Sequence, residues 1–274
     1  MLLTYGITLA QENDEIPSDK MILELFETAS DSSTKNADAK QVATERLVAI
    51  GPHAVDVLVE ELATKEVMKR VTLYEIFTKI GVNSWPYLVR GLKSESSNTR
   101  YRCADLIGEI VATDAKPALR ELLTIEKDSM VLPFALKSLG KIGNTDDIEL
   151  IAMFRNHEVE SIRRNTASAL GKIGDSSGID YLIEMLEDEI FSVRYPAMAA
   201  LIIIGDSSAQ PLISFLKMTN NKKSIGLALE ALAAIRGDRP AFVLIHYLES
   251  IDDQLSTYAE IACQRRDGFE YIDP

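Results

Sequence analysis

The chain has 274 residues, of which 46% are hydrophobic and 7% aromatic, and its formal net charge is -13. This charge argues against nucleic-acid binding, because contacts with a phosphate backbone need clustered Lys and Arg side chains. The hydrophobic fraction excludes disorder for most of the chain, and no segment approaches the roughly 20 apolar residues that an integral membrane helix needs.

The first ten residues, Met1 to Ala10, are apolar, and the stretch from there to Asp19 is polar and acidic. This order is similar to the end of a secretory signal peptide, although a basic n-region is missing. We therefore treat residues 1–19 as an N-terminal segment that leaves two localisations open. The protein is exported or periplasmic if the segment is a truncated signal peptide, and cytoplasmic otherwise.

Residues 20–30 form an amphipathic pattern that predicts an N-terminal cap helix, and residues 31–37 are predicted to form a loop. An isoleucine then recurs about every 31 residues, with a large apolar residue three positions before it and a leucine after it. The isoleucines are Ile50, Ile80, Ile110, Ile142, Ile173, Ile204 and Ile235. A period of this length predicts repeats that bury their apolar faces against one another. The predicted repeats span about 38–65, 66–94, 97–125, 129–156, 159–188, 191–218 and 222–250.

Each repeat is expected to contain two helices. In residues 161–188 apolar residues recur at helical spacing up to Ile173, and Gly174 follows where a left-handed residue ends a helix. The same glycine stop is expected at Gly51, Gly81, Gly143 and Gly205, with Gly237 one place later. The third repeat has no such glycine, so its turn at residues 111–114 is expected to be longer and without an αL glycine.

After the last repeat, residues 254–266 are predicted to form a closing helix, with Tyr258, Ile261 and Ala262 facing that repeat, and residues 267–274 a tail. The period thus predicts one solenoid domain over residues 20–266.

Two features of the repeats carry a family resemblance. An apolar residue followed by arginine stands near the start of first helices, as in Ile162-Arg163 and Val193-Arg194, and L-G-K-I-G stretches occupy 139–143 and 170–174. The units resemble HEAT repeats of the short, roughly 30-residue type found in phycobilin lyases. The resemblance covers about residues 38–250 and implies an all-α, right-handed, armadillo-like α-solenoid of about seven helix pairs, with a cap helix at each end.

A basic residue occupies one position of several repeats: Lys40, Arg70, Arg100, Arg163 and Arg194. We expect these side chains to pair with acids in the turns, such as Asp175 and Asp206. A strip that binds anions is the alternative.

The sequence contains no recognisable catalytic constellation or cofactor motif. The three histidines, His53, His157 and His246, fall in different repeats and are too far apart to share a metal ion. We therefore expect a protein that is not an enzyme and that holds neither a cofactor nor a metal.

One column on the second helices becomes apolar from the third repeat onward. It lies about 110° from the centre of the buried stripe, on a surface that generally lines the concave side of such arrays. Contact between adjacent repeats is one interpretation. The other is a groove for a peptide or partner helix, formed by Leu122, Met153, Tyr181, Met185, Phe215 and Tyr247.

These observations favour a non-catalytic scaffold or adaptor that presents a concave helical-repeat surface to a protein or peptide partner. A monomer is expected rather than an obligate oligomer. The family resemblance implies an alternative, a bilin lyase or chaperone-like protein that binds a tetrapyrrole or its acceptor protein. An exported structural envelope protein is a further alternative.

Overall fold

The computed structural model describes residues 17–33, 37–235 and 238–270. Within these residues all regular structure is helical, with no β-strand, which confirms the all-α prediction. The chain divides into two compact units, Met1–Ser84 and Trp85–Pro274, called here the N-terminal and the C-terminal unit. That residues 20–266 form one domain stays a prediction. None of the described helices combines the length and apolar character needed to cross a membrane.

The N-terminal unit begins with the predicted cap helix. The hydroxyl of Ser18 caps it by accepting a hydrogen bond from the Met21 amide at 3.3 Å, and Ile22 and Phe26 form its buried face against α2 and α3. The elements of this unit are α1 (Asp19–Ala29), α2 (Ala37–Ile50), α3 (Pro52–Leu58), η2 (Val59–Ala63), α4 (Val67–Ile80) and η3 (Gly81–Ser84).

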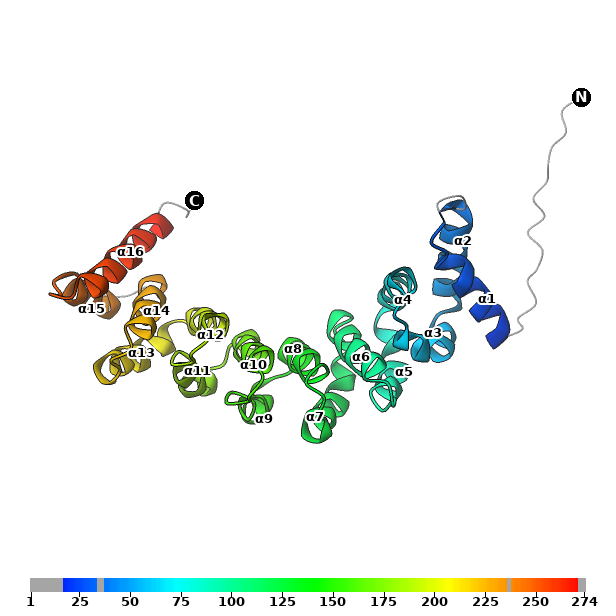
Figure 1. Ribbon diagram of the computed structural model, residues 1–274, viewed down its shortest axis with the longest axis horizontal. Coiled ribbons are helices and arrows are strands. Elements are labelled where there is room, and N and C mark those ends of the chain that lie inside the picture. Colours follow the sequence, from blue (N-terminus) through cyan, green and yellow to red (C-terminus); the bar gives the residue numbers. More distant parts are fainter. Residues whose placement is uncertain (1–16, 34–36, 236–237, 271–274) are drawn as a thin grey trace, which may run out of the picture. The chain divides into compact units, whose positions relative to one another are not determined.

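The C-terminal unit is built from two rows of helices (Figure 1). Each first helix lies against the first helix of the next repeat, as the periodic pattern predicts. The first helices are α6 (Ser97–Glu109), α8 (Leu132–Ile142), α10 (Glu160–Ile173), α12 (Phe191–Ile204) and α14 (Lys222–Ala234). The second helices are α5 (Trp85–Gly91), α7 (Lys116–Ile125), α9 (Ile148–Ala152), α11 (Ile179–Met185), α13 (Asp206–Met218) and α15 (Asp238–Leu248). Short 3₁₀ turns precede three of them: η4 (Thr113–Ala115), η5 (Thr145–Asp147) and η6 (Ser176–Gly178).

The residues three positions before the repeating isoleucines form the centre of the core. All of them are buried: Leu47, Phe77, Ile107, Leu139, Leu170, Leu201 and Leu232. The isoleucines themselves stand at or next to the ends of the first helices, and Ile50 and Ile173, for example, are only half-buried. The isoleucines thus mark the helix ends, while the residues of the neighbouring column are each at most 1% exposed.

Glycines allow the first helices of the C-terminal unit to approach closely. A Cβ atom at Gly140 would lie 2.6 Å from the Ala169 Cα, and one at Gly171 would lie 2.6 Å from the Ala200 Cβ. Real Cβ atoms do not approach this closely, so either substitution would push two helices apart. Gly108 stands in the same relation to Ser138 one repeat earlier.

Most of the predicted glycine stops have a positive φ. It is 70° at Gly51, 74° at Gly81, 69° at Gly174 and 76° at Gly205, a region that side chains disfavour. Gly174 alone among these has the ψ of a left-handed cap, 21°, whereas Gly205 has ψ -137°. Gly237 lies outside the described residues.

The expected left-handed stop at Gly143 is wrong, because this glycine is extended, with φ -77° and ψ 179°. A capping box takes over the turn. The Asp147 carboxylate accepts from the Asn144 amide at 2.8 Å, and the Asn144 side chain in turn accepts from the Asp147 amide.

The turn of the third repeat lacks a glycine, as predicted. Val111 adopts φ 53° there, and it is the one non-glycine residue with a positive φ in the described part of the chain. Its side chain is 57% exposed. A β-branched residue in this region strains the backbone.

The closing helix α16 (Asp253–Glu270) continues past the predicted end at residue 266, so the predicted tail is wrong for residues 267–270. Gly268 does not stop it, since a single glycine costs a helix only about 1 kcal/mol. Residues 271–274 lie outside the described part. Ala262 is buried and the Tyr258 ring lies against Gly226 of α14, as expected, but Ile261 is 42% exposed.

Candidate protein-binding surface

The predicted apolar column on the second helices does not form one exposed groove. Leu122, Met185 and Phe215 are buried, Tyr247 is half-buried, and Met153 is 74% exposed. Neighbouring second helices, such as α11 and α13, contact each other, so a position beside the buried stripe is covered by the next repeat. This burial matches the alternative interpretation of the column, contact between adjacent repeats. Partner binding at these residues stays a prediction, and Met153 is the most exposed of them.

Tyr181 lies in a polar cluster. Its hydroxyl donates to the Glu149 carboxylate at 2.8 Å, and the Arg155 guanidinium stands 5.1 Å from its ring centroid. Arg155 also pairs with Glu184 at 2.6 Å. The hydrogen bond to Glu149 raises the pKa of the Tyr181 hydroxyl. The Tyr181 side chain is thus engaged by polar groups of this chain, Glu149 and Arg155, rather than exposed as an apolar anchor.

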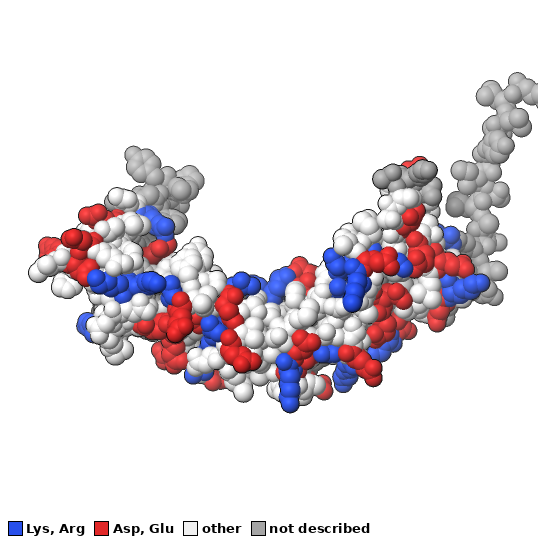
Figure 2. Space-filling model, in the orientation of Figure 1, with Lys and Arg blue, Asp and Glu red and all other residues white. Residues whose placement is uncertain are grey.

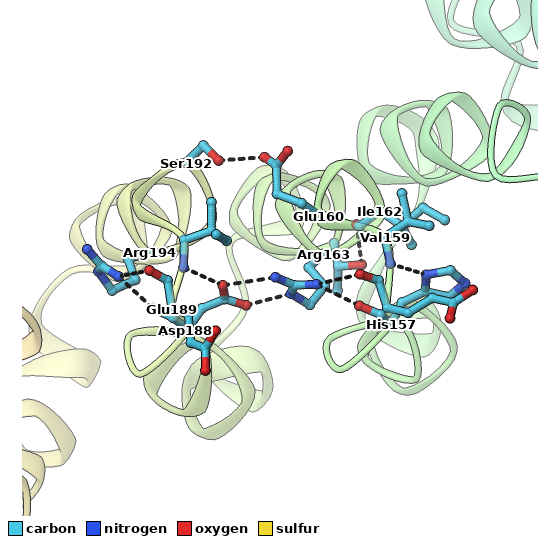
Figure 3. Close-up of polar contacts among 12 residues, drawn as sticks. His157, Val159, Glu160, Ile162, Arg163, Asp188, Glu189, Ser192 and Arg194 are labelled. Carbon is cyan, nitrogen blue, oxygen red and sulfur yellow. Dashed lines mark hydrogen bonds and ion pairs between the residues drawn. The ribbon is translucent and has the colours of Figure 1, made fainter.

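Three of the repeated arginines, Arg100, Arg163 and Arg194, bind backbone carbonyl groups at the end of the preceding repeat or just before the start of their own. Nη1 of Arg163 donates to the carbonyl oxygens of His157 and Glu158, at 2.8 and 3.1 Å (Figure 3). Nε and Nη2 of the same guanidinium bind the two oxygens of Asp188, at 2.6 and 3.1 Å. One side chain thus connects the end of the preceding repeat with the end of its own.

Arg100 repeats this geometry two repeats earlier. Its Nη1 binds the carbonyl oxygens of Ser94 and Glu95, both at 3.0 Å, and its Nε lies 2.7 Å from the Glu126 carboxylate. Burial raises the pKa of the Glu126 carboxyl, but the hydrogen bonds from Arg100 and from two backbone amides outweigh it and lower this pKa.

The partners predicted for the basic column were wrong in part. Arg100 and Arg163 are paired with acids, but these acids are Glu126 and Asp188, which stand where the arginine's own repeat ends. Asp175 instead caps its own turn and accepts from the Ser177 amide at 2.9 Å. On the visible face of the C-terminal unit, acidic and basic side chains are interspersed (Figure 2).

Arg194 departs from the pattern. Its Nη1 binds the carbonyl oxygens of Asp188 and Glu189 at 2.6 and 2.8 Å (Figure 3), yet its Nε finds no hydrogen-bond partner among the described residues. The side chain is only 6% exposed. Arg163 meets its acid 25 residues later, and the same offset from Arg194 reaches Thr219, which has no carboxylate.

Arg194 also lines a cavity of about 360 Å³ between α12, α14 and α16. Phe191, Lys223 and Tyr258 contribute to its wall. The wall also holds an ion pair between Arg265 and Glu230. With two further cations, Arg194 and Lys223, the cavity has a net positive charge in an acidic protein.

Exposed aromatic side chains adjoin the cavity. Phe191 is 58% exposed and Tyr195, one helical turn later, is 50% exposed, with ring centroids 5.8 Å apart. The Arg194 guanidinium lies 5.8 Å from the Phe191 ring. Sequence reasoning missed this surface because it followed the second helices. The spacing of Phe191 and Tyr195 on a first helix, outside the buried stripe, is the signal that could have found it.

Among the described residues no group of three or more His, Cys, Asp and Glu side chains could hold a metal ion. His157 lies within the turn that precedes α10, where its Nδ1 accepts from the Val159 amide at 3.0 Å.

Comparison with known proteins agrees with this fold. The family model described as HEAT repeats matches residues 86–159 and 149–233. No curated protein shows a significant sequence match.

Solved structures give likenesses at low identity. The structure of YibA from E. coli is 20% identical, with 90% of this chain and 95% of that chain covered and a TM-score of 0.50. A Kap121p mutant is 13% identical, with a TM-score of 0.56; the match covers 89% of this chain and 33% of Kap121p. The complex of CpcE and CpcF of phycocyanin lyase from Nostoc sp. PCC7120 is 20% identical. The match covers 94% of this chain and 98% of that chain, with a TM-score of 0.42.

The two likenesses with the higher TM-scores support the helical-repeat fold alone. The family match is more specific, since it covers residues 86–233, which is more than half of the chain. The chain belongs to the HEAT-repeat family.

Proposed function

We propose that this protein is a non-catalytic scaffold that binds a protein or peptide partner on the first-helix surface around Phe191 and Tyr195. The observation that carries the proposal is the exposure of these two aromatic rings beside a cavity lined by Arg194 and Tyr258. This surface is called the aromatic platform below. Tyr, Phe and Arg are the residue types enriched at the centres of protein interfaces.

Burial of the two exposed rings would contribute favourable free energy to a complex at the platform. Complete burial of one large apolar side chain contributes about 1.5–3 kcal/mol, and Phe191 and Tyr195 keep half or more of their surface in water. Aromatic side chains lose little conformational entropy on binding, so they suit a surface that must be ready for contact. The helical-repeat fold holds both rings on one rigid helix, α12.

A quantitative capture experiment tests the proposal. The tagged full-length protein and its Phe191→Ser/Tyr195→Ser variant are used to capture partners from the native host, and bound proteins are quantified by mass spectrometry. We expect at least one partner to fall about tenfold or more with the variant, which corresponds to a loss of about 1.4 kcal/mol.

Phe242→Ser is the matched control, because Phe242 is 74% exposed in the same unit but lies on α15. It should capture the same partners as the unchanged protein. Equal capture by all three proteins would contradict the proposal, and so would a loss that Phe242→Ser shares.

A further inference from the structure

Arg100 and Arg163 show which partner Arg194 lacks, namely a carboxylate. In Arg100 and Arg163 the edge of the guanidinium formed by Nε and Nη2 binds a carboxylate in a bidentate manner. Asp188 is the last residue of the repeat that contains Arg163, and Glu126 directly follows the repeat that contains Arg100. This geometry is the strongest pairing available to a guanidinium.

The sixth repeat keeps the arginine and replaces the acid. Thr219 stands at the acid position, and its hydroxyl is already hydrogen-bonded to the Glu187 carboxylate. The Arg194 residue is more than nine-tenths buried, and its Nε has no hydrogen-bond partner among the described residues. Arg100 and Arg163 each form an ion pair with their acid, whereas Arg194 forms none with the described residues, so its charge remains available to a carboxylate from another molecule.

The cavity beside Arg194 fits such a ligand. Its volume of about 360 Å³ lies within the usual range for binding pockets, and Lys223 adds a second cation. Gly226 of α14 leaves room for the Tyr258 ring, because a Cβ there would come within 3.0 Å of the ring. The cavity therefore combines an aromatic wall with positive charge.

We infer that this cavity receives the carboxylate of an acidic side chain from the docked partner, with Arg194 and Lys223 as the cations that attract it. The inference rests on the proposed docking function of the aromatic platform. An acidic side chain is favoured because Arg194 and Lys223 give the cavity a net positive charge. The platform next to the cavity supports a peptide, since an aromatic neighbour of the acid can contact Phe191 and Tyr195.

Titration with a defined peptide tests the inference. The probe is acetyl-Phe-Glu-amide, added to the full-length ¹⁵N-labelled protein while the arginine Nε–H signals are followed by NMR. Arg194→Lys identifies the Arg194 signal. We expect a saturable shift of this signal and about tenfold weaker binding of acetyl-Phe-Gln-amide, which has the same shape without the charge.

Two further arms separate the possible sources of the carboxylate and the possible failures. N-acetylphenylalanine carries a terminal carboxylate, and binding as tight as that of the Glu peptide would overturn the choice of a side chain. If the Tyr195 amide responds to the peptide while Arg194 does not, the aromatic platform stands and the carboxylate site is wrong. If neither responds, both proposals fail for acidic peptides.

A pair of variants tests the site without any ligand. Thr219→Glu places an acid at the register of Asp188 and should pair with Arg194, whereas Thr219→Gln has the same size and no charge. We expect a higher melting temperature for the Glu variant and about tenfold weaker peptide binding than in the Gln variant. Equal melting temperatures together with equal peptide affinity would overturn the inference.

Discussion

Asp188 connects two repeats, one through its carboxylate and the other through its backbone carbonyl. Its carboxylate binds Arg163, and its backbone carbonyl accepts from Arg194 (Figure 3). Burial raises the pKa of the Asp188 carboxyl, but the hydrogen bonds from Arg163 and from the Ile190 amide outweigh burial and lower that pKa below its ordinary value. A carboxyl with a lowered pKa stabilises the folded state only while it is ionised.

We expect Asp188→Asn to lower the free energy of unfolding by about 2 kcal/mol at neutral pH, because it removes a charged hydrogen-bond pair. The contribution of Asp188 is fully present above its unfolded pKa of about 3.9 and is lost as the pH falls through the lower folded pKa. Urea unfolding between pH 7 and 2.5 measures the difference, which should shrink below about pH 4. A difference that is constant over this range would contradict the assignment.

Val111 is strained by the turn it occupies. We expect Val111→Gly to raise the free energy of unfolding by about 1 kcal/mol, since glycine adopts a positive φ without steric cost. Val82 is the matched control, because it is 50% exposed and does not have a positive φ. Val82→Gly should leave stability unchanged or lower it by up to about 1 kcal/mol, as thermal unfolding of both variants can show.

At the scale of helices, the C-terminal unit depends on close contact between first helices. The contact is made by a glycine in one repeat and a small residue in the next, as with Gly171 and Ala200. The sequence predicts the helix pairs well, because the apolar period and the glycine stops are local signals. It does not reveal the first glycine of each L-G-K-I-G stretch as a contact point, because its partner lies about 29 residues away.

The apolar column on the second helices could not be assigned from the sequence for a similar reason. A position beside the buried stripe is exposed or covered according to how near the next second helix lies, and the residues of one repeat do not determine that distance. Leu122, Met185 and Phe215 are covered, whereas Met153 at the end of the short helix α9 is exposed. Arg194 and Thr219 illustrate the same limit, because their relation appears only when the arginine pairs of other repeats are visible.

Gly171→Val tests the helix contact. We expect it to lower the free energy of unfolding by about 2–3 kcal/mol, because the added side chain must push α10 and α12 apart. Gly178→Ala is the control, since a Cβ there would lie 3.9 Å from Leu170 and the backbone is already helical. Chemical denaturation should show little change for the control, and a comparable loss in both variants would refute the close-contact explanation.

At the scale of the whole molecule, stability in a repeat array is a sum of local contacts, and the ends need their own covers. In the C-terminal unit α16 provides that cover by packing on α14 and α15. Ala259 and Ala262 of α16 are buried, and their small side chains allow α16 to lie close to these helices. The period predicts a closing helix at this place, but its length follows from the residues after 266, which have no periodic counterpart.

We expect Ala259→Glu to detach this cover, because Ala259 is fully buried and lies outside the positively charged cavity, so the new charge would be buried without a partner. Hydrogen exchange should then become faster in α14 and α15 and stay unchanged in residues 17–84. Gln264→Glu introduces the same charge at an exposed position of α16 and serves as the control. Faster exchange throughout the chain in the Ala259 variant would show that the array unfolds as one cooperative unit.

The glycine contacts also bear on how an array of this kind can change its length. Gly140 faces Ala169, and Gly171 faces Ala200, so the two junctions are chemically interchangeable. Deletion of residues 143–173 would remove one period and place Gly140 opposite Ala200, another alanine. Gain or loss of a whole repeat by recombination would therefore leave these junctions intact, whereas an insertion of a few residues between Gly140 and Ala169 would change the spacing of that junction.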